Sequence, residues 1–132
     1  MRGTETSFGS EWNAALGNMA NKEVPISYDL ALLAEYENRE ENLKSVFRKT
    51  QESLVVVDIA ITKKSGQFEI GPNLVARLPE GFRPIMRKHT TGYSVGSQIL
   101  LRIYIDPDGS VYVHPNVALN TALGQIVFIA DK

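Results

Sequence analysis

The chain has 132 residues, of which 43% are hydrophobic and 22% charged, with a formal net charge of −1 and a pI near 6.1. This composition is typical of a globular chain with a buried core, and it argues against a basic surface for nucleic acid or an anionic membrane. Because the sequence has no cysteine, disulfides, thiolate metal sites and cysteine nucleophiles are excluded.

The N-terminal residues predict a tail followed by a short helix. Residues 1–10 are rich in Gly, Ser and Thr without periodicity, which indicates a flexible or partner-ordered segment. Ser10 is a candidate N-cap, and Trp12, Leu16 and Met19 follow at helical spacing. We find no secretory signal and no apolar run near the ~20 residues of a membrane span, so we expect neither secretion by a signal peptide nor membrane insertion.

A second helical segment is predicted over residues 28–50. Ser27 is a candidate cap, and apolar residues recur at a three-and-four spacing interrupted by the polar run 37–42, which leaves one stalk helix or two short helices open. The apolar positions are Leu30, Leu33, Tyr36, Leu43 and Phe47. Two arrangements compete: an exposed helix lying on the β region, or a narrow seam in a stalk shared between copies, which we slightly prefer.

From residue 53 the period changes to two, and we expect strands. Residues 54–62 form a β-branched strand, 63–66 a turn, and 67–71 a return strand with Phe68 and Ile70 on one face. A short segment over 74–77 precedes a corner specified by Pro79, Gly81 and Pro84. Extended structure follows over 85–89, then a loop or edge over 90–97, and a last strand over 125–130.

The strongest structural signal is the hairpin over residues 98–114. Aliphatic residues alternate from Ile99 to Ile105, which places the odd-numbered side chains on the core face. The segment Pro107-Asp108-Gly109 then favours a tight reversal, and Ser110 to His114 returns.

Runs of this kind predict about seven or eight short strands in some eighty residues. We therefore expect a mainly β fold, an antiparallel jelly-roll-like β-sandwich preceded by short N-terminal helices. The predicted division is an N-terminal tail and helical segment, 1–52, and a β-sandwich head, 53–132.

Catalytic and metal-binding chemistry find little support. His89 and His114 are the only histidines and belong to no catalytic motif. Asp106 and Asp108 would be weak calcium ligands, and a turn explains both. No spacing favours a carboxylate pair for glycoside hydrolysis, and no glycine-rich phosphate loop is present. We predict no catalytic residue, no metal and no cofactor, and we expect a non-enzymatic protein.

Binding is the chemistry that the sequence favours. Several aromatic and basic side chains lie on polar faces or loops of the central region, and aromatic rings beside polar donors suit saccharides and protein surfaces. The candidate ligand-binding residues are Arg87, His89, Tyr93, Tyr112 and His114, with Tyr104, Lys88 and Arg102 in the same region. Each residue by itself is more often structural, as in an ordinary cross-strand pair.

Two motifs carry a resemblance to a known group of proteins. The corner LPEGFRP and the hairpin IDPDGSVYV, within residues 53–132, resemble the C-terminal β-sandwich head domains of bacteriophage tail fibres and baseplate receptor-binding proteins. The matching positions are Leu78, Pro79, Gly81, Arg83, Pro84, Ile105, Asp108, Gly109, Val111 and Val113.

The resemblance implies a viral protein of the tail or baseplate of a virion, made in the host cytoplasm. It implies a homotrimeric jelly-roll head that mediates host adhesion by binding a cell-surface saccharide or protein, with residues 1–52 contacting other phage proteins. The alternative is a virion structural adaptor that binds only other virion proteins. A small carbohydrate-active enzyme is a further alternative.

Overall fold

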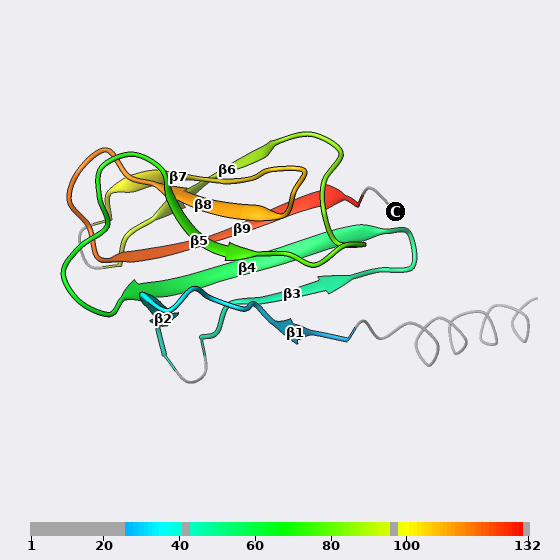
Figure 1. Cartoon of the computed structure of the whole chain (residues 1–132), viewed down its shortest axis with the longest axis horizontal. Coiled ribbons are helices and arrows are strands. Elements are labelled where there is room, and N and C mark those ends of the chain that lie inside the picture. Colours follow the sequence, from blue (N-terminus) through cyan, green and yellow to red (C-terminus); the bar gives the residue numbers. More distant parts are fainter. Residues whose placement is uncertain (1–25, 41–42, 96–97, 131–132) are drawn as a thin grey trace, which may run out of the picture.

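The computed structural model describes residues 26–40, 43–95 and 98–130 (Figure 1). These residues form nine strands: β1 (Tyr28–Asp29), β2 (Tyr36–Asn38), β3 (Val46–Lys49), β4 (Leu54–Lys63), β5 (Asn73–Arg77), β6 (Lys88–Tyr93), β7 (Leu100–Ile105), β8 (Ser110–His114) and β9 (Thr121–Ile129). No helix occurs in the described ranges, and none there could cross a membrane.

All nine strands belong to one curled antiparallel sheet. Its order is β1-β3-β4-β9-β6-β7-β8-β5, with β2 paired to β4. The two ends of this order meet, because Leu32 bridges Ala76 and the Leu33 amide donates to the Val75 carbonyl at 2.9 Å. Figure 1 shows β4 and β9 as the long strands along which the shorter ones are arranged. The mainly β, antiparallel prediction is confirmed, whereas the jelly-roll arrangement stays a prediction.

The core fills the inside of the curl. Alternate residues of β4 point inward, and Val55, Val57 and Ile61 are fully buried. They pack against inward residues from β7, β8 and β9, and from the loops that close the ends of the curl. The sheet thus has one apolar inner face and one outer face that remains available for function.

The predicted hairpin over residues 98–114 is confirmed as β7 and β8. Ile105 pairs with Val111, and Gly109 has a φ of 89°, which a residue without a Cβ adopts at no steric cost. Leu101, Ile103 and Ile105 are buried as expected, while Ile99 is 40% exposed because it precedes the strand.

The helical prediction for residues 28–50 is wrong, because this segment supplies β1, β2 and β3. Phe47 reaches the core by pairing opposite Val57 of β4, and buried Ser45 accepts the Ala60 amide through Oγ at 2.9 Å. The three-and-four spacing arose because separate strands and loops each contribute single apolar residues. The predicted domain boundary falls in the turn between β3 and β4, which pair in the same sheet. The helix predicted after Ser10 lies outside the described residues.

Two other local predictions are also corrected. Residues 67–71 do not pair with β4: Phe68 is buried and its amide donates to Leu119 O, whereas Ile70 is 68% exposed. Asn73 fixes this loop through hydrogen bonds from its amide to Glu69 O at 2.8 Å and to Val113 O at 3.2 Å.

Residues 90–97 were predicted to be a loop or an edge strand. Residues 90–93 belong instead to the central strand β6, which pairs with both β7 and β9. Gly92 belongs there for a packing reason. A Cβ at this position would lie 2.5 Å from Leu123 O and 2.6 Å from Ile103 Cδ1. The glycine signal was therefore one of close packing and not of a turn.

Candidate ligand-binding face

The register of three neighbouring strands builds an ordered outer surface. His89, Tyr104 and Tyr112 lie opposite one another on β6, β7 and β8 and form an aromatic row. Two residues along, the same strands place Thr91, Arg102 and His114 opposite one another and form a polar row. Because strand side chains alternate, both rows point away from the core. We call this surface the two-row face.

Tyr104 lies at the centre of the two-row face and is only 5% exposed. Its ring stacks on Tyr112 with centroids 5.2 Å apart and planes 27° apart, and the His89 ring lies 5.4 Å away. The Arg87 guanidinium lies 4.5 Å from the Tyr104 centroid, within cation–π range. The neighbours therefore cover Tyr104, while His89 is exposed and Tyr112 half-buried.

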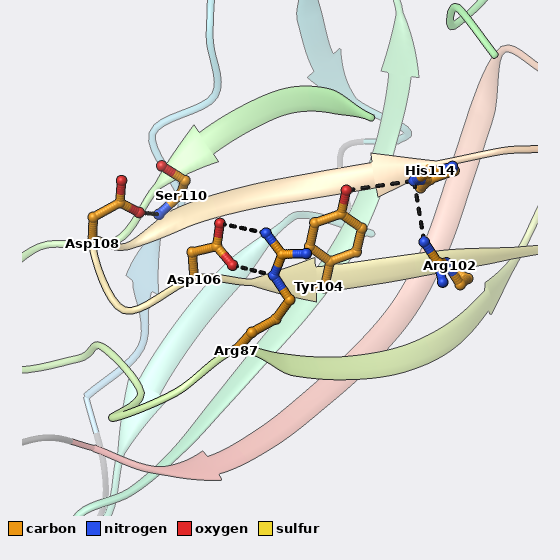
Figure 2. Close-up of polar contacts among 7 residues, drawn as sticks. All are labelled: Arg87, Arg102, Tyr104, Asp106, Asp108, Ser110 and His114. Atoms are coloured by element: carbon orange, nitrogen blue, oxygen red, sulfur yellow. Dashed lines mark hydrogen bonds and ion pairs between the residues drawn. The ribbon is translucent and has the colours of Figure 1, made fainter. Parts of the chain in front are cut away.

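Arg87 is held over Tyr104 by an ion pair with Asp106 (Figure 2). The guanidinium donates from Nε to one carboxylate oxygen and from Nη2 to the other at 3.0 Å, which is the two-point geometry that arginine and carboxylate favour. The hydrogen bond to Asp106 is the main cause that raises the pKa of Arg87. The charge of Arg87 is thus locally neutralised.

Arg102 and His114 have a different environment. Arg102 Nη2 and the Tyr104 hydroxyl each lie 3.4 Å from His114 Nδ1, so the three side chains form a chain of polar contacts (Figure 2). Arg102 is exposed, and within the described ranges it makes no ion pair with a carboxylate. The polar row therefore carries an uncompensated guanidinium beside an imidazole.

The structure brings together all the predicted binding residues except one. Arg87, His89, Tyr112 and His114 surround Tyr104. Tyr93 lies at the far end of β6 and lines a separate hollow with residues such as Asp58 and Gln125.

Sequence patterns did not predict that Tyr104 lies at the centre of the face or that Asp106 orients Arg87. The hydrophobic alternation did place Tyr104 on the outer side of β7, which was the available signal. The approach of Arg87 to Asp106 depends on pairing between β6 and β7, which nothing local specifies.

The two aspartates of the hairpin serve structural contacts. Asp106 binds Arg87, and Asp108 accepts the Ser110 amide at 2.9 Å, a hydrogen bond that is the main cause lowering the Asp108 pKa. No group of three or more His, Asp or Glu side chains in the described part of the chain is arranged to hold a metal ion.

A second exposed feature lies at the end of the sheet where β9 finishes. Ile85, Met86, Val127 and Ile129 are between 47% and 65% exposed and, with Leu54, line a shallow groove. We call these five residues the apolar patch. Scattered exposed aliphatics are ordinary on a protein surface, but a contiguous group is typical of a surface that binds another protein.

Comparison with known proteins shows a likeness of fold. No family model matches the chain, and no curated protein matches it by sequence. Among solved structures, the crystal structure of the receptor binding protein (gp15) of Listeria phage PSA matches with a TM-score of 0.67 and 16% sequence identity. The match covers 98% of this chain and 81% of that chain. The chain therefore has a fold like that of a phage receptor-binding protein.

Proposed function

We propose that this chain is a non-enzymatic bacteriophage protein of the tail fibre or baseplate that attaches the virion to a host cell-surface receptor. Its fold resembles that of a phage receptor binding protein. The observation that carries the proposal is the two-row face, which concentrates aromatic, cationic and hydrogen-bonding side chains on one exposed surface. The receptor we propose is a saccharide.

The chemistry of the two-row face suits a sugar. Saccharides present patches of C–H groups that pack on aromatic rings, and hydroxyls that need donors and acceptors nearby. Tyr112 and His89 offer partly open rings, while Thr91, Arg102 and His114 offer polar groups. The stacking and the ion pair that hold Tyr104 and Arg87 fix this surface before a ligand arrives, which lowers the entropic cost of binding.

A binding assay on bacterial envelopes tests the proposal. Full-length protein carrying a fluorescent label is incubated with purified cell envelopes from a panel of bacterial species, and bound label is measured. We expect binding to at least one species, loss of about tenfold or more in affinity for Tyr112→Ala, and little change for Tyr93→Ala, which removes a more exposed tyrosine outside the face.

Treatment of the envelopes separates the kinds of receptor. Periodate, which oxidises sugar diols, should abolish binding, whereas protease should not. Protease-sensitive binding would contradict the saccharide receptor, and equal losses for the two tyrosine variants would contradict the two-row face as its site.

We further propose that the protein is a homo-oligomer, a trimer, in which copies cover one another's apolar patch. The patch would otherwise leave Ile85, Met86 and Ile129 more than half exposed to water. Sedimentation velocity should show a trimer that Ile129→Glu dissociates. Val117→Glu, which changes another exposed aliphatic at 41% exposure, should leave it intact.

The apolar patch also favours the second candidate, a virion structural adaptor. In that case the chain is a monomer in solution, and its patch and residues 1–52 contact other tail or baseplate proteins. A concentration-independent monomer that binds no envelope but binds a purified tail protein would establish the adaptor and overturn receptor binding.

A further inference from the structure

We infer that the two-row face selects a saccharide that carries a negative charge, and that Arg102 is the residue that binds the charged group. This inference rests on the proposed saccharide-binding function and specifies its ligand class. The ligand chemistry is an oxyanion, carboxylate or phosphate, attached to a sugar.

The distribution of charge over the face supports this inference. On the two-row face, Arg87 forms an ion pair with Asp106. Arg102 contacts His114 and the Tyr104 ring instead, and it has no carboxylate partner among the described residues. His114 Nδ1 accepts from the guanidinium of Arg102 at 3.4 Å, so the imidazole orients this cation without neutralising it. On the same outer side of the sheet, Asp58 is occupied by Arg48 at 3.0 Å and Gln125 at 2.6 Å. Asp58 and Asp106 are therefore both already engaged in ion pairs.

The geometry around Arg102 suits an oxyanion in particular. A guanidinium presents a planar fork of donors that matches the two oxygens of a carboxylate or phosphate, and this pairing is stronger and more directional than contact with a neutral hydroxyl. Arg102 is exposed and positioned by His114 on one side, while Thr91 faces it from β6.

The spacing of the two rows matches a sugar that bears a charge. The rows are two residues apart along the strand, which is about 7 Å. A sugar ring packed on the aromatic row therefore places a substituent, or the charged group of the next unit, over the polar row. Neutral saccharides would occupy the aromatic row and leave the guanidinium of Arg102 without an ionic partner.

The test compares matched sugars by NMR titration of the isotopically labelled full-length chain. The probes are methyl glucoside, methyl glucuronoside, glucose 6-phosphate and inorganic phosphate. We expect the two acidic sugars to shift the amides of β7 and β8 and the Nε–H signal of Arg102. They should bind at least fivefold tighter than methyl glucoside or inorganic phosphate, and added salt should weaken this preference.

Two variants assign the charged group to Arg102. Arg102→Gln should reduce binding of both acidic sugars by about fivefold or more, to the level of methyl glucoside. Arg48→Gln removes the same charge from the outer side of the sheet near β4 and should change binding less than twofold. Equal losses in the two variants would mean a general charge effect and would overturn the inference.

The outcomes also separate this inference from the proposed function. Equal binding of methyl glucoside and the acidic sugars at the two-row face would overturn the charged ligand but keep a saccharide site. Binding of inorganic phosphate as tightly as glucose 6-phosphate would indicate an anion site without sugar recognition, and would also overturn the inference. No shift on the face with any sugar, together with no envelope binding, would overturn both.

Discussion

β6 and β9 approach each other closely at Gly92 and Gly124, where both strands contact the Ile103 side chain. Adding a methyl group at either glycine therefore tests how tightly the central sheet is packed. Replacing Gly92 by Ala introduces a Cβ at 2.5 Å from the Leu123 carbonyl oxygen and 2.6 Å from Ile103 Cδ1. The carbonyl belongs to a central strand and cannot move without disturbing its ladder, and Ile103 is fully buried. Overpacking of this kind costs about 3 kcal/mol, which lowers the midpoint of thermal unfolding by roughly 10–20 °C in a domain of this size.

Gly124 is the matched control because it lies on the other side of the same contact. A Cβ there would meet Ile103 Cδ1 at 2.7 Å, while the nearest backbone atoms, Gly92 Cα and Thr91 O, lie at 3.3 Å and 3.9 Å. The obstacle is the end of a side chain that can rotate, so Gly124→Ala should cost about 1 kcal/mol.

Ile103→Val, which removes Cδ1, should then restore most of the stability of Gly124→Ala and only part of that of Gly92→Ala. The two double-mutant cycles, measured by thermal and urea unfolding, isolate these coupling energies. Full rescue of Gly92→Ala by Ile103→Val, or equal costs for the two glycines, would refute the role given to the Leu123 carbonyl.

Two further predictions concern the polar contacts that fix the turns. The Ser110 amide lowers the pKa of Asp108 below its ordinary value of 3.8, so this group stabilises the fold above pH 3.8 and the contribution is lost as pH falls through the lowered value. Asp108→Asn, which keeps an acceptor but does not titrate, should be less stable than the parent at pH 6 in urea unfolding, and the difference should shrink as pH falls below 3.8 and through the lowered pKa of Asp108; a pH-independent difference would contradict this. Asn73→Ala should cost about 2–3 kcal/mol because it leaves buried partners such as Val113 O unsatisfied, whereas exposed Asn116→Ala should be neutral; equal effects would contradict the role of Asn73.

The sequence predicted the parts of the fold that local signals determine. In the β7–β8 hairpin, the alternation of aliphatics and the Pro107-Asp108-Gly109 turn act on neighbouring residues, so they specify the register without reference to the rest of the chain. The pairs Arg102–His114 and Tyr104–Tyr112 follow directly from that register.

The segment over residues 28–50 could not be assigned in the same way. Its strands are short and depend on long-range pairing: β2 and β3 pair with β4, and β1 pairs with β3. The Tyr36 and Phe47 side chains from β2 and β3 are part of the core. Intrinsic preference is a weak guide when such long-range pairing decides the conformation. The polar run that interrupted the helical spacing was the local sign that one amphipathic helix would not explain the segment.

The two-row face depends both on the local signals of the hairpin and on long-range strand pairing, and Asp106 takes part in both. Its backbone closes the predicted turn, with the amide donating to Ser110 O at 3.0 Å and the carbonyl accepting from Gly109 at 2.9 Å. Its carboxylate binds Arg87, which directly precedes β6 and is brought close by the β6–β7 pairing that the sequence did not reveal. Any residue except proline could supply the two backbone groups, but only an acidic side chain forms an ion pair with the guanidinium. The identity of residue 106 therefore matters more for the two-row face than for the turn, although the turn is what makes it conspicuous in the sequence.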